Sequence, residues 1–188
     1  MRIDLVHEAL NGLKVFQPEV FEDERGFFCE VYRKDHFTAA GVTEEFVQDN
    51  HSKSAHGVVR GLHFQWEPPM AKLMRVTQGE AFLVAVDIRI GSPSFGQWYG
   101  ELISDKNRRL IYAPAGFARG FCVTSESAEI QYKCTGIYNS GAEAGILWND
   151  PAIGISWPVL DPTLSNKDKV APTLADWEKD PRAQNFKY

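Results

Sequence analysis

The sequence has few cysteines, and it lacks long apolar runs, internal repeats and low-complexity tracts. Its three cysteines (Cys29, Cys122 and Cys134) are odd in number, lie far apart and form no CxxC pair. We therefore expect a reduced, cytoplasmic protein. No apolar run approaches the roughly 20 residues that a membrane span needs. The first ten residues, MRIDLVHEAL, include acidic side chains where a signal peptide would be apolar. We expect no membrane partner.

An excess of positive charge is also missing. The chain has 20 Lys and Arg residues against 25 Asp and Glu residues, a net charge of −5. This balance argues against a nucleic-acid partner, but a local basic site for a small anionic ligand is compatible with it. The contents of 44% hydrophobic and 24% charged residues are typical of a soluble globular protein. A chain of this length fits one domain, residues 1–188.

What the sequence has in abundance is short runs rich in Val, Ile, Phe and Tyr, separated by turn residues about every 8–12 positions. This pattern predicts an all-β fold, a sandwich or barrel. The expected strands cover residues 15–21, 27–32, 45–54, 58–65, 72–79, 80–89, 98–104, 109–114, 120–125 and 129–138.

Few helices are expected. Residues 35–41 and 173–180 are the candidates, and Thr173 is a plausible N-cap for the second. The chain becomes loop-like after Asn149, but Ile153 and Trp157 make this C-terminal segment too apolar for disorder. We expect residues 149–188 to pack back on the barrel.

The stretch RGLHFQWEPPMAK, residues 60–72, contains a single histidine. Strand alternation places His63 and Gln65 on one face. The runs ending in His63 and in Arg119 resemble the two halves of the cupin signature, which normally supplies three histidines and a glutamate to a metal. Gln65 and Arg119 stand at ligand positions here, and neither suits a transition metal. We therefore expect no metal.

A histidine on an apolar strand can also be an ordinary core residue. Here Arg60, His63, Gln65 and Lys72 are all polar, in a segment that should supply the core. Burying so many polar groups without a ligand would be costly. A solvated pocket that binds a ligand is the better interpretation.

The chain resembles the dTDP-4-dehydrorhamnose 3,5-epimerase family of metal-free cupin barrels. The matching motifs follow one another along nearly the whole chain. They are DERGFFCE (23–30), QDNHSKS (48–54), GVVRGLHFQ (57–65), KLMRVTQG (72–79), VDIR (86–89), SFGQW (94–98), PAGFA (114–118), YKCTGIY (132–138), WNDP (148–151) and LSNKD (164–168). The resemblance implies a jelly-roll barrel that inverts two carbons flanking a ketone on a nucleotide-linked sugar, without a cofactor.

Four catalytic roles are implied by this resemblance. His63 matches the base, and an imidazole exchanges protons near neutral pH. Asp168 matches the carboxylate that orients the base. Lys72 matches the cation beside the enolate oxygen, and Tyr132 matches the acid on the opposite face. Each residue also has an ordinary structural alternative. Asp168 could cap a turn, Tyr132 could be a barrel aromatic, and Lys72 could be a solvated edge residue.

Substrate recognition is assigned to further residues. Arg25 and Arg60 are candidates for the diphosphate, because a guanidinium matches phosphate oxygens. Phe28 matches the residue that stacks on thymine. The remaining candidates for binding a dTDP-4-keto-6-deoxyhexose are Glu30, Gln48, Asn50, Tyr138 and Lys167. In this family the N-terminal segment crosses to a second subunit, so the resemblance implies a homodimer with shared active sites.

Two positions depart from the family pattern. Arg119 replaces a histidine, and Leu83 replaces an aspartate. We interpret this as a coordinated change at neighbouring positions. The role of Arg119 stays open: it could add a cation for phosphate or for the sugar carbonyl, or mark a relative that inverts one carbon or acts on a differently deoxygenated sugar. Three alternatives stay open. They are a single-centre epimerase or ketoisomerase, a non-enzymatic sugar-binding module, and a metal-dependent cupin enzyme.

Overall fold

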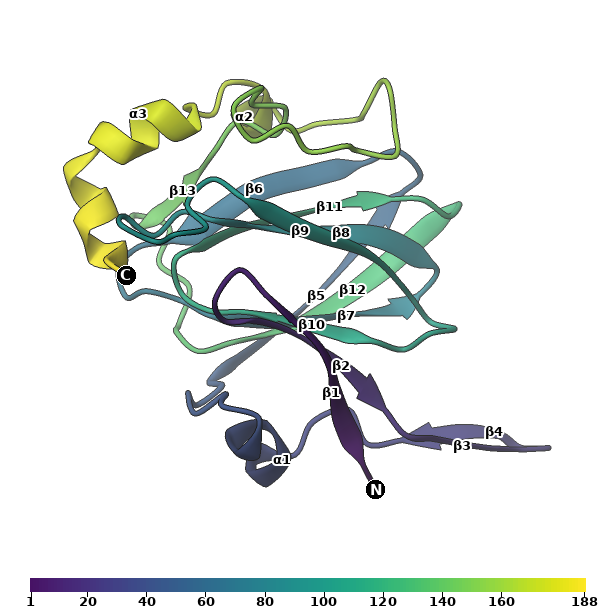
Figure 1. The fold of residues 1–188 in the computed structure, drawn as a ribbon. Helices are drawn as coiled ribbons and strands as arrows, with labels where there is room; N and C mark the ends of the chain where they lie inside the picture. Colours follow the sequence, from purple (N-terminus) through teal and green to yellow (C-terminus); the bar gives the residue numbers. More distant parts are fainter.

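Two antiparallel sheets face each other in the computed structural model, which describes all 188 residues (Figure 1). The first sheet has the order β1 (Ile3–Ala9), β2 (Leu13–Pro18), β10 (Leu110–Ala113), β7 (Lys72–Gln78), β12 (Ser127–Cys134) and β5 (Gln48–Ala55). The second has the order β13 (Glu143–Gly145), β6 (Val59–Gln65), β11 (Phe117–Val123), β8 (Glu80–Asp87) and β9 (Trp98–Ser104). The all-β prediction is confirmed.

A separate hairpin and a few short helices complete the chain. The hairpin consists of β3 (Val20–Asp23) and β4 (Gly26–Cys29), and it projects away from the two sheets (Figure 1). The helices are α1 (Lys34–Ala39), α2 (Asn166–Lys169), α3 (Leu174–Lys179) and the 3-10 helix η1 (Pro181–Phe186). None of them is long and apolar enough to cross a membrane.

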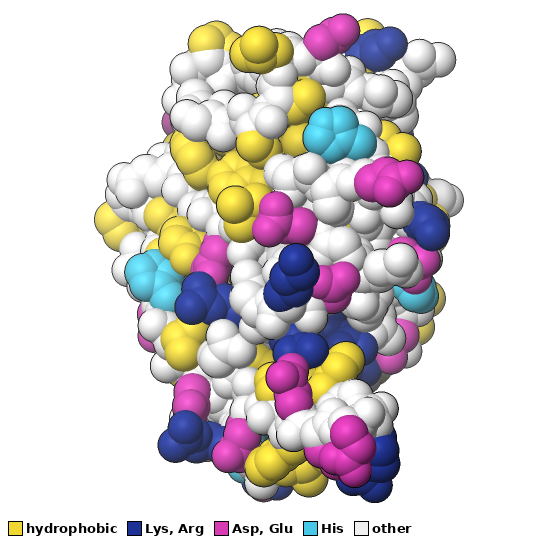
Figure 2. All heavy atoms as spheres, turned by 90° about the vertical axis from the view of Figure 1, so that its right-hand side faces the viewer, with side chains coloured by type: hydrophobic (Ala, Val, Ile, Leu, Met, Phe, Trp, Pro, Cys, Tyr) yellow, Lys and Arg dark blue, Asp and Glu magenta, His cyan; other side chains and the backbone are white.

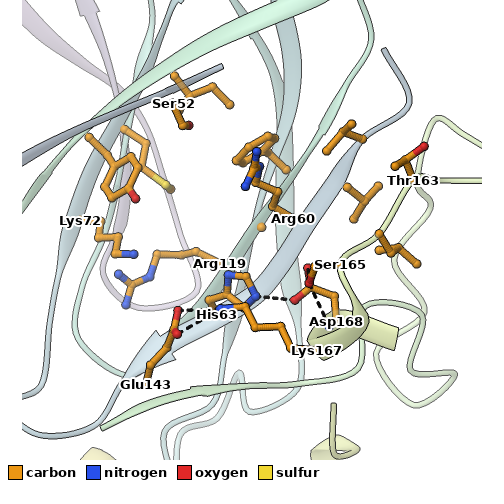
Figure 3. Close-up of a pocket in the computed structure, with 18 residues that line it drawn as sticks. Ser52, Arg60, His63, Lys72, Arg119, Glu143, Thr163, Ser165, Lys167 and Asp168 are labelled. Carbon is orange, nitrogen blue, oxygen red and sulfur yellow. Dashed lines mark hydrogen bonds and ion pairs between the residues drawn. The ribbon is translucent and has the colours of Figure 1, made fainter. Parts of the chain in front are cut away.

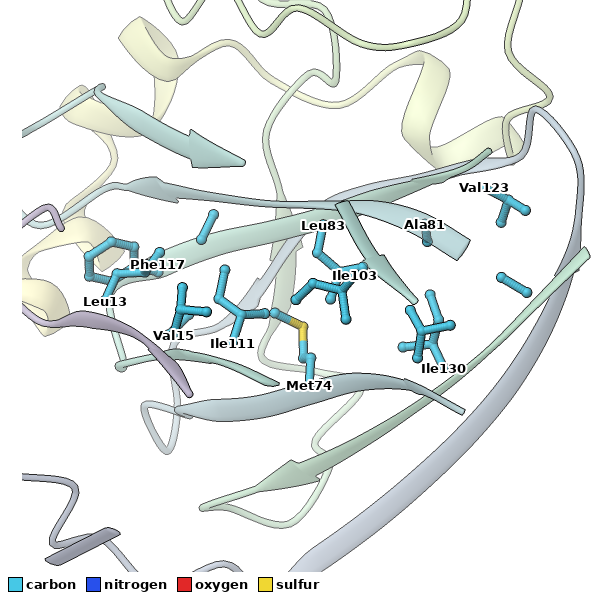
Figure 4. Close-up of a cluster of buried hydrophobic side chains, with 14 residues drawn as sticks. Leu13, Val15, Met74, Ala81, Leu83, Ile103, Ile111, Phe117, Val123 and Ile130 are labelled. Atoms are coloured by element: carbon cyan, nitrogen blue, oxygen red, sulfur yellow. The ribbon is translucent and has the colours of Figure 1, made fainter. Parts of the chain in front are cut away.

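The main core lies between the two sheets, where the apolar side chains of alternating residues meet (Figure 4). Leu83 and Ile103 from the second sheet face Ile111 and Ile130 from the first, and all four are at most 2% exposed. Alternation therefore decides which side chains reach the interior, because successive residues of a strand point to opposite faces.

The outer face of the second sheet is covered by the C-terminal segment. Leu62 and Phe64 point outward from β6 and pack with Trp177 and Phe186. The rings of Phe64 and Trp177 lie 4.6 Å apart, centroid to centroid. Thr173 caps α3 in a reciprocal capping box with Asp176, which fixes the start of that helix.

Some expected element bounds were wrong. The run 15–21 is not one strand, since β2 ends at Pro18 and β3 starts at Val20. Pro18 has no N–H for a ladder, and the next amide, Glu19 N, bonds to Arg2 O instead. The expected strand 27–32 ends at Cys29, and the expected strand 129–138 ends at Cys134. The edge strand β1, the three-residue β13 and the four-residue α2 were not predicted.

Charged side chains of both signs are interspersed over the face of the molecule shown in Figure 2. Lys and Arg residues there lie among Asp and Glu residues, and no continuous basic surface covers this face. This distribution agrees with the net charge of −5. Any basic site for an anionic ligand on this face is therefore local.

Candidate active site

A cavity of about 490 Å³ occupies one end of the barrel interior. Side chains from β5, β6, β7, β11, β12 and β13 line it, and residues 163–168 cover one side (Figure 3). The four expected catalytic residues, His63, Lys72, Tyr132 and Asp168, all line this cavity. Strand alternation predicted that Tyr132 points inward, but for His63 it left open which face of the strand does; the structure places both side chains in the cavity.

The His63 and Asp168 side chains form a dyad. His63 Nε2 lies 2.5 Å from Asp168 Oδ1. Asp168 is only 3% exposed, and its second oxygen accepts a hydrogen bond from Ser165 Oγ at 2.8 Å. Burial by itself would raise the pKa of Asp168, but the hydrogen bonds from His63 and Ser165 outweigh it and lower that pKa. Asp168 is therefore a carboxylate at neutral pH.

This hydrogen bond also fixes which nitrogen of His63 is free. An ionised carboxylate can only accept, so Nε2 carries the proton that is shared with Asp168. The Nδ1 atom of the neutral ring then keeps its lone pair and has no hydrogen-bond partner within the chain. The dyad can accept a proton at Nδ1 and hold the resulting imidazolium beside a negative charge.

Lys72 and Tyr132 come from the opposite sheet. The Lys72 ammonium lies 4.8 Å above the centroid of the Tyr132 ring. Burial, followed by the positive charge of Arg119, lowers the pKa of Lys72 to about 8. Burial, followed by the nearby Cys134, raises the pKa of Tyr132, so its phenol keeps its proton at neutral pH. The cavity thus holds a cation and a weak acid opposite the dyad.

Arg119 lies at the closed end of the cavity. It pairs with His63 across β11 and β6, and it is 4% exposed. Burial lowers its pKa to about 10, so it stays charged at neutral pH. On the other side of β11, Leu83 pairs with Phe121, which makes Leu83 and Arg119 diagonal neighbours on adjacent strands.

The mouth of the cavity is polar. Arg60 is exposed there and donates from Nε to Ser54 Oγ at 3.0 Å. Lys167 forms an ion pair with Glu143 at 3.0 Å, and Tyr138 OH donates to the same carboxylate at 3.2 Å. Glu143 and Ser165 were not predicted from the sequence. Glu143 lies outside the quoted motifs, in a strand too short to recognise.

Several expected binding residues do not reach this cavity. Arg25 and Phe28 sit on the projecting hairpin, where Arg25 pairs with Asp23 and Phe28 is 60% exposed. Gln48 and Asn50 lie on β5 and bond to each other at 3.1 Å. Glu30, which follows the hairpin, pairs with Arg33 at 3.5 Å.

Gln65 is turned away from the cavity toward the loop that follows β12. Its amide donates to Pro68 O and Ile137 O and accepts from Asn139 N. No group of three or more His, Cys, Asp or Glu side chains is arranged to hold a metal ion. The carboxylates that line the cavity with His63 are Asp168, bonded to His63, and Glu143, paired with Lys167, and the cations Lys72 and Arg119 also line it, a poor match for a transition metal.

Comparison with known proteins agrees with this geometry. The family model described as dTDP-4-dehydrorhamnose 3,5-epimerase matches residues 7–176. A protein of that name from Neisseria gonorrhoeae is 49% identical over 178 residues, which cover 94% of this chain and 54% of that protein. The chain thus spans about half of that relative's length.

A solved structure of full matching length is also similar. The crystal structure of dTDP-6-deoxy-D-glucose-3,5-epimerase from Legionella pneumophila, in complex with dTDP-4-keto-L-rhamnose, matches with a TM-score of 0.93 and 42% identity. The match covers 100% of this chain and 99% of that one. A dTDP-4-dehydrorhamnose 3-epimerase from Streptomyces niveus is 39% identical over 170 residues, 89% of this chain and 82% of that protein. This chain belongs to the dTDP-4-dehydrorhamnose 3,5-epimerase family.

Proposed function

We propose that this chain is a single-domain epimerase. It inverts carbons 3 and 5 of dTDP-4-dehydro-6-deoxy-D-glucose and gives dTDP-4-dehydro-L-rhamnose. The observation that carries this proposal is one cavity that holds the His63–Asp168 dyad on one side and Tyr132 with Lys72 on the other. A base and an acid on opposite walls are what inversion of a carbon next to a ketone requires.

The reaction begins at the dyad. His63 Nδ1 removes the proton from a carbon beside the C4 ketone, and the C–H electron pair forms a carbon–carbon double bond. The C4 oxygen becomes an enolate oxygen, which the Lys72 ammonium stabilises. Asp168 stabilises the imidazolium that forms at His63, because its carboxylate already bonds to Nε2.

Tyr132 completes the inversion from the other face. Its phenol delivers a proton to the carbon opposite the side from which His63 removed one, and the enolate returns to the ketone. His63 and Tyr132 then recover their starting protonation states by exchange with solvent. The same two groups serve carbons 3 and 5 in turn, because both carbons flank C4.

The mouth of the cavity would hold the nucleotide. The exposed cations Arg60 and Lys167 line it and suit a diphosphate. Arg25 and Phe28 would complete a second subunit's site, with Phe28 stacking on thymine. The projection of their hairpin away from their own cavity and the exposure of Phe28 support a homodimer with shared sites.

A single-centre epimerase is the second candidate, because the Streptomyces niveus relative is named a 3-epimerase. The test is incubation with dTDP-4-dehydro-6-deoxy-D-glucose and a coupled reductase, followed by NMR of the product. The proposal expects an L-configured product from the wild type and none from His63→Ala. A product inverted at one carbon favours the second candidate, and no product overturns both.

A further inference from the structure

Resting on the proposed function, we propose that Arg119 is a positioning residue that acts through Lys72. Its buried charge makes the closed end of the cavity an oxyanion site with two positive charges, which the enolate oxygen neutralises as it forms. Arg119 itself does not touch the sugar. Arg119 is the residue that stands where the family pattern has a histidine.

The Arg119 side chain is held rigidly. Its Nε donates to Phe117 O at 2.9 Å, and its Nη2 donates to Met70 O at 2.7 Å. Its Nη1 is buried and has no hydrogen-bond partner. Two backbone carbonyls therefore clamp the guanidinium and leave its positive charge without a carboxylate.

The Arg119 side chain is oriented toward Lys72. Their side-chain ends point toward each other in Figure 3, and the charge of Arg119 acts on the Lys72 ammonium. Lys72 has no hydrogen bond or ion pair with any carboxylate of the chain. Two buried like charges without a counter-ion repel each other, so a negative charge that develops beside them is stabilised more than a neutral ground state.

Arg119 and Lys72 are placed to stabilise one atom of the substrate, the C4 oxygen. Arg119 pairs with the base His63 across the strands, and Lys72 lies over the ring of the acid Tyr132. The two cations thus lie beside the base and beside the acid. The C4 oxygen is the one sugar oxygen whose charge changes in both inversions, and it lies between the two carbons that these groups serve.

Other groups that face Lys72 are few. The thiol of Cys134 and the carboxylate of Glu143 favour its charged form, and the ammonium of Lys167 opposes it. Glu143 is already paired with Lys167 at the mouth. Arg119 is consequently the strongest of the charged neighbours acting on Lys72, second only to burial.

The experiment measures the protonation of Lys72 directly and then its effect on the reaction. The ¹³Cε shift of Lys72 is titrated in wild type, Arg119→Gln and Arg119→Lys, with Lys72→Arg used to assign the signal. We expect the midpoint to move up by about one pH unit in Arg119→Gln and to stay near the wild-type value in Arg119→Lys. An unmoved midpoint in Arg119→Gln overturns the proposal.

Kinetics supply the second measurement. Deuterium exchange into the sugar should slow roughly 10- to 100-fold in Arg119→Gln, and dTDP affinity should not change. Arg182→Gln is the matched control, since it removes the same charge at an exposed residue that pairs with Asp180 and does not line the cavity. It should leave the Lys72 midpoint in place.

The outcomes separate the two proposals. A wild type that exchanges no deuterium overturns the proposed function, and the Lys72 titration still tests Arg119. If Arg119→Gln does not fold, a crystal structure of wild type with dTDP-4-keto-L-rhamnose decides. A C4 oxygen bound by Lys72 Nζ, with Arg119 still on its two carbonyls, supports the proposal, and a C4 oxygen turned toward the mouth overturns it.

Discussion

Asp168 Oδ1 accepts a hydrogen bond from His63 Nε2 at 2.5 Å, although 105 positions separate the two residues in the sequence. His63 comes from β6, next to the edge strand β13 of the second sheet, and Asp168 comes from α2 in the segment that covers the cavity. The dyad therefore exists only because the C-terminal segment folds back over the barrel. Catalysis by His63 therefore requires that the C-terminal segment is packed over the cavity, where Asp168 reaches the imidazole.

Replacing Asp168 by asparagine should remove most of the activity. The amide cannot hold the Nε2–H tautomer or stabilise the imidazolium, so kcat should fall roughly 10²–10⁴-fold. The coupled reductase assay measures kcat, and calorimetry with dTDP checks that the nucleotide still binds. Asp161→Asn makes the same chemical change at an exposed site and should be neutral. A fully active Asp168→Asn would contradict the dyad.

Replacing Tyr132 by phenylalanine should separate proton removal from inversion. The base and Lys72 remain, so the enolate still forms, but no phenol delivers a proton to the opposite face. We expect deuterium exchange with retained configuration and inversion slowed about 10²–10⁴-fold. NMR of the sugar in D₂O measures both. Inversion at the wild-type rate would show that another group is the acid.

The wild-type pH profile should have an alkaline limb that belongs to Lys72. The charged ammonium is the form that stabilises the enolate, and its pKa is lowered to about 8. Activity should therefore be present below pH 8 and lost as the pH rises through that value. In Lys72→Arg the side chain stays charged, so the residual activity should show no such limb up to pH 10. An identical limb in both proteins would assign it to another group.

Mixing two defective subunits should restore activity if the sites are shared. One subunit carries His63→Ala, and the other carries Arg25→Ala with Phe28→Ala. In a mixed dimer one site combines an intact cavity with an intact hairpin, so co-refolding at equal amounts should restore about a quarter of wild-type activity. Sedimentation verifies the dimer. No restoration would place the hairpin in its own subunit's site, and an Arg25→Ala, Phe28→Ala subunit that is active before mixing would exclude the hairpin from catalysis.

Strand alternation predicted much about which side chains share a face at the site. The period of two predicted that His63 faces away from Leu62 and Phe64, and that Tyr132 shares a face with Ile130. The structure places both polar side chains in the cavity and packs Leu62 and Phe64 under the C-terminal helices. These features were predictable because one face of each strand is fixed by burial.

Other features depend on contacts that a sequence pattern does not encode. The clamp on Arg119 uses backbone carbonyls of Phe117 and Met70, which any residue could supply. Glu143 reaches the mouth because the short strand β13 pairs with β6 beside His63. The strand β1 is an edge strand with mostly exposed side chains, so it lacks the apolar alternation of a half-buried strand.

Whether His63 is the one base for both carbons can be decided by NMR of dTDP-4-dehydro-6-deoxy-D-glucose incubated in D₂O with wild type and with His63→Ala. We expect deuterium at carbons 3 and 5 with the wild type and at neither carbon with His63→Ala. Exchange that persists at either carbon in His63→Ala, or wild-type exchange at one carbon alone, would contradict this expectation.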